Sequence, residues 1–597
     1  TDLIDTQIVT IDSTGPQIDI VTPPRGAWTT EAVVEVSGTV EDWVSELATL
    51  EINGTDIEDI SDTAFAHDLD LGFGINIIET MASDTDLDED GIGNQSADVR
   101  AVLQADTFID PTASMDDGLL FRLWEGEGGL GQLETMATSL MDSLDLETVF
   151  EEPILEETYC VSILWWEICQ TLIGYVDELG YGSVSMSVDP TEAGLIDAQL
   201  TLSDVFVTLR TEGYIEGSGT VSATAVHVNM SFVPAVDESG FLAIEDFTIE
   251  IPTPEGFTVE LDEELTDATE TFDLDAEGLI EEQLTISLAG IIEGAVPALL
   301  SDTLGALAFD QEFEFADNSY TLSSRLQTVE VDEAGITFVA RTQLDVGEEV
   351  VSELEGLVEG VPYFGYGRPT VGESGSGTQF SLSTDMLNQL MFALWRGGML
   401  NQELTDADLG LDMSVVELLL PGLESLSIVT TPLLPPVVTP RTDFSEGNEY
   451  DLSLGDMLFE IHNGEITEDS LIIELYVSAQ APLALSAEEA GWSLGMEISD
   501  PVVYVDAVYV DPAFPVAVET IESLFESLMA SYLPDLAGVL GTVPLPEVAG
   551  LTIADISTAM DGSDDPPGYW VLTGSLEVIL ASSEDTGSLV DTGDPAD

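Results

Sequence analysis

The stretch Phe380–Leu400 constrains the fold more than any other part of the chain, because it predicts a helix that is apolar on almost every side. Apolar residues recur at helical spacing from Met386 to Trp395. Ser383 is placed to cap the helix, and a pair of glycines that begins at Gly397 is placed to end it. Such a helix must bury nearly its whole circumference, either in protein or against lipid.

The charge of the chain restricts its partners. Among 597 residues there are 117 acidic side chains against nine basic ones, all arginine, which gives a net charge of −108. Such a surface repels the phosphates of nucleic acids and of anionic membranes, so neither is expected as a partner. Two interpretations of the acidity stay open: adaptation to high salt, which screens the self-repulsion, or a surface that needs divalent cations. Hydrophobic residues still make up 44% of the chain, enough for large cores.

The first hundred residues predict an all-β unit. Short alternating runs separated by turn residues fill 15–106, which is typical of a β-sandwich. The phrases PQIDIVTPPRGAWTT, VEVSGTVED and GINIIETMASD resemble the bacterial Ig-like modules of secreted and surface proteins. The resemblance implies that this unit meets surface partners. Residues 1–14 are interpreted as the end of a preceding repeat or as a linker.

An acidic loop inside this unit is a candidate calcium site. Alternating aspartates followed by glycine allow a tight turn to bring several oxygens onto one hard cation. Counted from Asp86, the twelfth position is Ala97, so the bidentate glutamate of an EF-hand is missing. The Gly-Ile-Gly-Asn ending of the loop is closer to the calcium loops of thrombospondin-type repeats. A solvated acidic hairpin is the alternative. The candidate ligands for Ca²⁺ are Asp84, Asp86, Asp88, Asp90 and Asn94.

The rest of the chain uses one order of elements twice, which points to two related modules rather than a solenoid. Helical stripes and long alternating runs are separated by a strand-rich middle that ends in a Gly/Ser linker. The expected elements are a helix at 115–150, strands at 181–275, a helix at 276–307, then a helix at 385–396, strands at 449–510 and a late helix at 514–540.

Four phrases carry a resemblance to a known family. In order, they are DDGLLFRLWEGEGGLGQLETMATSL, GLIEEQLTISLAGIIEGAVPALLSDTL, FSLSTDMLNQLMFALWRGGML and FPVAVETIESLFESLMASYLPDLAGVLGTVPLPEVAGL. In this order and spacing the chain resembles the tubular lipid-binding superfamily of bactericidal/permeability-increasing protein, lipopolysaccharide-binding protein and cholesteryl ester transfer protein. The resemblance extends from roughly residue 110 to residue 578.

The resemblance implies an α+β fold of two pseudo-symmetric barrels in a boomerang, each a strongly twisted antiparallel sheet wrapped around long helices. It also implies an apolar slot in one or both barrels that takes acyl chains. The expected divisions are a first barrel at 107–345, a central sheet or linker at 346–378, a second barrel at 379–580 and a disordered acidic tail at 581–597.

Two features depart from that family. The basic patch with which its antibacterial members meet endotoxin phosphates is missing, since Arg122 and Arg210 are the only cations between 101 and 324. Neutralisation of lipopolysaccharide is therefore not expected. The two cysteines, Cys160 and Cys169, lie close together, unlike the family's usual pairing. For them a small disulfide and two buried free thiols both stay open.

The preferred lipid site lies in the first barrel, between its two helices. Small residues on the second helix, such as Gly294, are where space is expected beside the apolar stripes. Ordinary core packing is the alternative for each apolar residue, because both roles bury the same kind of surface. The candidate lipid contacts are Leu133, Met136, Leu140, Leu284, Leu288, Ile291, Ile292, Ala295 and Leu299.

Catalysis finds little support in the sequence. His67, His227 and His462 are scattered, and no G-x-S-x-G occurs. We therefore expect a non-enzymatic protein, outside the cell or on a bacterial cell surface or in the periplasm, that binds or transfers a phospholipid or another acyl lipid. No stretch is long and apolar enough to predict a transmembrane segment. A calcium-stabilised structural or adhesive surface protein is the alternative from another class.

Overall fold

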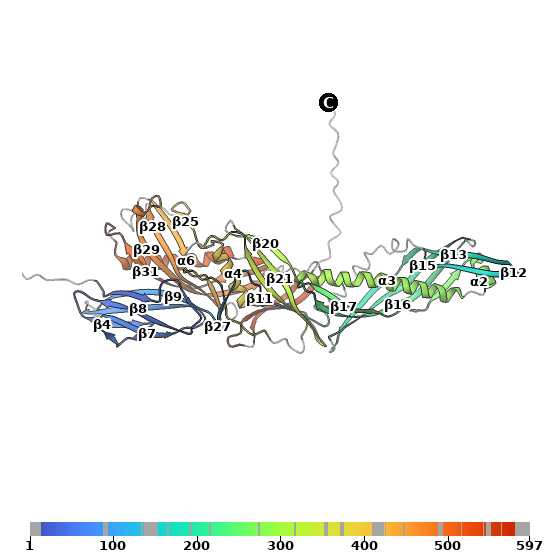
Figure 1. Cartoon of the computed structure of the whole chain (residues 1–597), viewed down its shortest axis with the longest axis horizontal. Coiled ribbons are helices and arrows are strands. Elements are labelled where there is room, and N and C mark those ends of the chain that lie inside the picture. The colour runs from blue at the N-terminus through green and yellow to red at the C-terminus, as the bar shows by residue number, and fades with distance from the viewer. Residues whose placement is uncertain are drawn as a thin grey trace, which may run out of the picture.

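Long strands dominate the chain and build an elongated molecule (Figure 1). In the computed structural model the N-terminal unit lies beside the C-terminal half at one end, and the first half of the repeated region extends to the other end. The structure describes residues 14–578 apart from 62, 88–92, 133–134, 136–152, 154, 164–165, 192–193, 214–215, 273–274, 316–317, 352–355, 370–374, 409–422, 424, 446–447, 488–492, 515, 541–542, 545–550 and 563.

The N-terminal unit consists of two sheets that share one apolar core, which includes Val36, Ile52 and Ile78. The first sheet has the strand order β1 (Gln17–Thr22), β3 (Val33–Glu41), β7 (Ala64–Asp70) and β6 (Ile60–Ser61). The second has the order β2 (Ala27–Thr29), β9 (Gly93–Gln104), β8 (Gly74–Leu87), β4 (Leu47–Ile52) and β5 (Thr55–Asp56).

A buried ion-pair network fixes this unit to the C-terminal half. The Arg25 guanidinium pairs with Asp506 and lies 3.5 Å from Asp456. It also lies 4.0 Å from the centre of the Tyr476 ring, a cation–π contact. The Asp456 carboxylate accepts a hydrogen bond of 2.8 Å from the backbone N–H of Gly26. Burial raises the pKa of Asp456 to about 6, because removal from water disfavours the charged form.

The first half-barrel is an antiparallel sheet whose longest strand, β16, buries nearly every second residue. This alternation gives the sheet one apolar face. Helices α2 (Glu263–Phe272) and α3 (Ala276–Leu304) follow it, and the 3₁₀ turn η2 (Gly305–Leu307) ends α3. The strands are β12 (Leu155–Ile163), β13 (Trp166–Gly180), β15 (Ile196–Gly213), β16 (Gly217–Val236) and β17 (Leu242–Ile249) in spatial order, with β14 (Ser183–Pro190) on β15, and β18 (Thr253–Glu255) and β19 (Thr258–Leu261) on β16.

A seven-stranded central sheet draws on three distant parts of the chain. Of the segment 346–378, the described strand residues are Val346, strand β23 (Val361–Tyr363), which pairs with β10 (Thr107–Ile109), and Thr378. The order is β20 (Asp310–Phe315), β21 (Asn318–Asp332), β22 (Gly335–Val346), β11 (Met115–Trp124), β24 (Thr378–Ser383), β34 (Tyr569–Val578) and β33 (Leu551–Asp561).

The second half-barrel repeats the antiparallel arrangement. Helix α4 (Thr384–Arg396) precedes its strands and α6 (Val518–Leu540) packs on β31 and β30. The strand order is β25 (Glu403–Thr405), β26 (Leu426–Pro432), β28 (Asn448–Asn463), β29 (Leu471–Ala487), β30 (Ser493–Ile498) and β32 (Val543–Pro544), with β27 (Val437–Ser445) on β28, β31 (Val502–Val510) on β29, and the 3₁₀ turn η3 (Glu468–Ser470) before β29.

The predicted α+β fold of two barrels wrapped around long helices is wrong. The chain is mostly β, and in the described parts its sheets are half-barrels that do not close around a long helix. Helix α3 shows the reason: Ile292 is fully buried on one side, while Ile286 is 51% exposed on another. One flank of this helix therefore faces solvent.

The start of the helix predicted at 115–150 also differs from the prediction. Residues 115–124 form strand β11 in the middle of the central sheet, paired with β22 on one side and β24 on the other. Leu119 through Trp124 are all buried. A short apolar run that is buried on both faces has no periodicity by which to distinguish strand from helix.

Candidate apolar binding site

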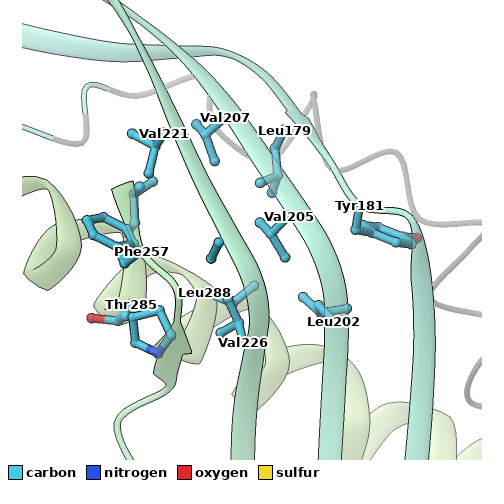
Figure 2. Close-up of a pocket in the computed structure, with 13 residues that line it drawn as sticks. Leu179, Tyr181, Leu202, Val205, Val207, Val221, Val226, Phe257, Thr285 and Leu288 are labelled. Carbon is cyan, nitrogen blue, oxygen red and sulfur yellow. The ribbon is translucent and has the colours of Figure 1, made fainter. Parts of the chain in front are cut away.

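An apolar pocket lies between the inner face of the first half-barrel and helix α3 (Figure 2). Its empty volume is about 570 Å³, part of it open to solvent. Strands β15 and β16 supply six of the thirteen lining residues, and three residues of α3 lie against them. The lining side chains are Leu179, Tyr181, Leu202, Val205, Val207, Val221, Ala223, Val226, Pro254, Phe257, Leu284, Thr285 and Leu288.

The wall of the pocket is bent at Asp204. This residue has a φ of 50°, in the left-handed region that aspartate tolerates better than most residues. In a regular strand, alternate side chains share a face, so Leu202 and Val205 would point to opposite sides. Both line the pocket instead, and their cross-strand partners Val226 and Ala223 do the same. The two strands change phase together, and the inner face is apolar on both sides of the bend.

Helix α3 contributes a side chain whose polar group is already satisfied. The Thr285 hydroxyl donates to the backbone carbonyls of Glu281 at 2.8 Å and Glu282 at 3.0 Å within the same helix. Its methyl group is left for the pocket, where Leu284 and Leu288 flank it. The pocket therefore presents an almost entirely apolar surface to a ligand.

The nine predicted lipid contacts fall into four groups. Leu284 and Leu288 line the pocket, whereas Ile292 is buried in the core beside it and is not part of the lining. Ile291, Ala295 and Leu299 lie in α3, but their side chains are outside the described part. The other three predicted contacts, Leu133, Met136 and Leu140, lie outside the described residues.

Two of the small residues of α3, Gly290 and Gly294, do not line the pocket. Gly290 and Gly294 are exposed, and a Cβ added at either position would meet nothing within 4 Å. The interpretation that space is left beside Gly294 is therefore wrong, because this glycine lies on the solvent side of the helix. The space arises on the strand side, at the bend beside Ala223.

Sequence reasoning missed the strand residues of the wall. Two patterns indicate these wall residues: apolar residues alternate in 200–209 and 219–234, and the alternation breaks between Leu202 and Val205. The break could have been found in the sequence, since two apolar positions an odd number apart in one strand cannot share a face without an irregularity.

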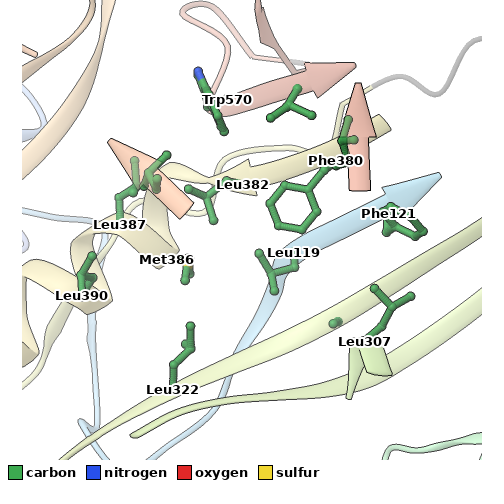
Figure 3. Packing of buried hydrophobic residues seen from close by; sticks show 14 of the residues in the cluster. Leu119, Phe121, Leu307, Leu322, Phe380, Leu382, Met386, Leu387, Leu390 and Trp570 are labelled. Carbon is green, nitrogen blue, oxygen red and sulfur yellow. The ribbon is translucent and has the colours of Figure 1, made fainter. Parts of the chain in front are cut away.

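Helix α4 is the opposite case. Every residue from Thr384 to Trp395 is buried, so protein, and not lipid, covers this helix. The Trp395 indole N–H donates to the carbonyl of Pro432 at 3.0 Å, and the Asn388 amide exchanges two hydrogen bonds with the backbone of Val438. Figure 3 shows Met386 and Leu390 among side chains of the central sheet. The empty space beside these two residues is about 210 Å³.

A buried carboxylate holds the start of α4. Asp385 accepts hydrogen bonds from the backbone N–H groups of Phe364 at 2.9 Å, Gly365 at 3.1 Å and Tyr366 at 3.3 Å. Burial outweighs these contacts and raises the pKa of Asp385 to about 6. The helix start and the segment that follows β23 are thereby joined through one titratable group.

The calcium candidates are only partly visible. Asp84 is buried, and its two oxygens accept hydrogen bonds from the backbone N–H of Asn94 at 2.9 Å, the Asn94 amide at 2.8 Å and the Ser45 hydroxyl at 3.0 Å. The Asp86 side chain, Asp88 and Asp90 lie outside the described part. Among the described residues there is no group of three or more metal-ligating side chains. Calcium binding stays a prediction. In the structure, the hydrogen bonds of Asp84 with Asn94 join β8 to β9.

The cysteines face each other across a strand pair. Cys160 in β12 and Cys169 in β13 are direct cross-strand partners. Cys169 is disulfide-bonded, and Cys160 is the only other cysteine of the chain. The prediction of a small disulfide is therefore confirmed, and the alternative of two buried free thiols is wrong.

The three histidines lie on three different sheets. His67 is in β7, His227 in β16 and His462 in β28. His227 contacts the hydroxyl of Thr201, and His462 contacts that of Ser470. They are not arranged as a triad.

Among the described helices, none has the length and apolarity needed to cross a membrane.

Comparisons with known proteins give distant likenesses. No protein-family model matches the chain, and no curated protein matches it. The chain is similar to a solved lipopolysaccharide-binding protein at 12% identity and a TM-score of 0.41, over 78% of this chain and 100% of that one. It is also similar to P47 of Clostridium botulinum E1 at 8% identity and a TM-score of 0.25, over the same 78% and 100%. At these values the functional case rests on the geometry of the chain itself.

Proposed function

We propose that the chain is a non-enzymatic lipid-binding protein that acts outside the cell and holds an acyl chain in the pocket of the first half-barrel. The observation that carries the proposal is the lining: of its thirteen residues, Tyr181 and Thr285 are the two with polar side chains.

The binding energy would come from burial of hydrocarbon. Each methylene removed from water contributes roughly 0.8 kcal/mol, and no charged group of the lining opposes it. A polar headgroup would stay at the open side of the pocket, in contact with water. Either a phospholipid or another acyl lipid satisfies this arrangement, because the lining recognises the chain and not the headgroup.

The test is a titration of the purified full chain with a fluorescent fatty acyl probe. Ala223→Trp places a large ring in the pocket and is expected to weaken probe binding by about tenfold or more, since a few lost methylene contacts suffice for that factor. Gly294→Trp is the matched control, because it adds the same ring on the solvent side of α3. Circular dichroism confirms that both variants fold.

Two outcomes would reject the proposal. One is the absence of probe uptake by the wild-type chain together with the absence of co-purifying lipid in native mass spectrometry. The other is equal probe affinity of the wild type and a folded Ala223→Trp variant, which would place the ligand elsewhere.

A further inference from the structure

Arg341 is exceptional among the nine arginines. Each of the other eight is ion-paired with at least one carboxylate, as expected in a chain of net charge −108. Arg341 is exposed on β22 and has no ion pair among the described residues. With 117 acidic residues in the chain, an arginine without a carboxylate partner is the unexpected case.

A second arginine lies directly opposite. Arg325 in β21 is the cross-strand partner of Arg341 in β22. Like charges in this position destabilise a strand pair, so two of only nine cations occupy a costly arrangement. Arg325 is anchored, because its guanidinium donates to both oxygens of Asp310, at 2.8 and 2.7 Å, and lies 5.1 Å from the Phe241 ring centre. Its charge is thereby offset, and the charge of Arg341 is not.

Both arginines line one polar pocket. The pocket lies where the turn between β16 and β17 meets the central sheet, and its empty volume is about 870 Å³. Strand alternation places Ser323 and Gln343 on the same face as the arginines, opposite the buried Leu322 and Leu344, and all four polar residues line the pocket. The Ser323 hydroxyl donates to Asp310 at 2.6 Å and the Gln343 amide donates to Asp345 at 3.0 and 3.2 Å, so both groups are engaged with carboxylates, while Arg341 has no ion pair among the described residues.

Two carboxylates also border this pocket and limit what it can accept. Asp237 is engaged in its own turn, where Oδ1 accepts from the backbone N–H groups of Ser239 at 2.8 Å and Phe241 at 2.9 Å. Glu238 is exposed at the tip of that turn. Because these two carboxylates repel an anion, a ligand has to be a small anionic group that contacts Arg341 without passing over the turn.

We propose that this pocket binds an oxyanion, such as a phosphate or carboxylate group, with Arg341 as the principal contact. The planar guanidinium fork matches two oxygens of such a group and forms charge-assisted hydrogen bonds with it. The oxyanion is either a free ion or the headgroup of a lipid. The proposal does not rest on acyl-chain binding, because the pocket lies on the outer face of β21 and β22, away from the apolar site.

The acidity of the whole chain gives the site an unusual salt dependence. The net charge repels an approaching anion over long distances, and added salt screens this repulsion beyond a Debye length of about 8–10 Å. The short contact with Arg341 is screened less. Phosphate affinity is therefore expected to rise between about 10 and 150 mM salt, whereas an ordinary basic site loses affinity over this range.

The experiment is calorimetric titration of the full chain with inorganic phosphate at these two salt concentrations. Arg341→Gln is expected to lower the affinity by about tenfold or more, as for loss of a charge-assisted hydrogen bond. Arg210→Gln is the control, because Arg210 is an exposed arginine that is paired with Asp177 at 2.7 Å. It is expected to leave phosphate affinity unchanged.

A second arm separates the two sources of the oxyanion. Flotation with phosphatidylcholine vesicles that contain phosphatidic acid is expected to depend on Arg341 if the group is a lipid headgroup. Binding of inorganic phosphate without vesicle binding would identify a free ion. The proposal is overturned if the wild type binds neither, or if Arg341→Gln changes neither. Acyl probe uptake by Arg341→Gln should equal that of the wild type, so failure here is distinguishable from failure of the apolar site.

Discussion

Helices α3 and α4 both carry many apolar residues but lie in opposite environments. Each residue of α4 from Thr384 to Trp395 is buried, while α3 has exposed residues along one flank, including Ile286 and Gly294. The space beside Met386 and Leu390 in α4 is about 210 Å³, against about 570 Å³ at the apolar pocket beside α3. An apolar helix therefore does not by itself define a lipid site. The elements that cover it decide whether it is core or pocket.

The polar contacts of the two helices explain part of the difference. Side chains of α4 hold it against three neighbouring segments: Asp385 on 364–366, Asn388 on Val438 and Trp395 on Pro432. In α3 the Thr285 hydroxyl bonds within the helix, and Ser301 near the end of the helix donates to the carbonyl of Leu242 at 3.3 Å. Helix α4 is therefore locked into its surroundings, and α3 leaves a gap toward the bent strands.

The comparison is tested most strongly by truncating one leucine in each helix. Leu390→Ala in α4 is expected to lower the free energy of unfolding by about 2–5 kcal/mol and to leave acyl probe binding intact. Leu288→Ala in α3 should cost only about 1–2 kcal/mol, since part of that side chain already faces empty space, and should alter probe binding. Urea unfolding and probe titration measure both. Equal destabilisation with unchanged probe binding would contradict the distinction.

The buried start of α4 predicts that the stability of the chain depends on pH. The pKa of Asp385 is raised to about 6, above its ordinary value, so the folded state binds this proton more tightly than the unfolded state. The resulting stability is fully present below about pH 4 and is lost as the pH rises through about 6. The loss is on the order of 2–3 kcal/mol for a shift of about two pKa units.

Asp385→Asn should remove this contribution. Unfolding of the wild type and the variant is followed at several pH values from about 4 to 7, and the difference between their free energies of unfolding should change across that window. A difference that stays constant with pH would show that the Asp385 carboxyl does not titrate in this range.

The smallest expected effect concerns the solvent side of α3. Gly294→Ala adds a better helix former where a Cβ meets nothing within 4 Å, and it should stabilise the chain by about 0.5–1 kcal/mol. Probe affinity should not change, because this side of the helix is away from the pocket. Thermal unfolding gives the first quantity and probe titration the second. A drop in probe affinity would show that the acyl chain lies along the exposed flank instead.

The sequence predicted the positions of the helices better than it predicted which elements pack around them. The second and third predicted helices match α3 and α4 within a few residues, because their apolar spacing and end signals are strong. The helix predicted at 115–150 begins too early, since residues 115–124 form a strand, and a strand buried on both faces has no alternation by which to recognise it. The closed barrels were wrong because no local pattern records how far a sheet curves around a helix.

The candidate site could be predicted only in part, for similar reasons. Leu284 and Leu288 follow from helical spacing, but the wall from Leu202 to Val226 depends on the positive φ of Asp204 and on the pairing of β15 with β16. The facing arginines are invisible in the sequence, where sixteen positions separate Arg325 from Arg341, and only the β21–β22 register brings them together.

The most direct test of the account is to map where an acyl chain binds. A fatty acid that carries a diazirine in its chain is photo-crosslinked to the full protein, and the labelled peptides are identified by mass spectrometry after cleavage at acidic residues. We expect labels on β15, β16 and α3 that disappear in Ala223→Trp and persist in Gly294→Trp. Labels on α4 and the second half-barrel, unaffected by Ala223→Trp, would contradict it.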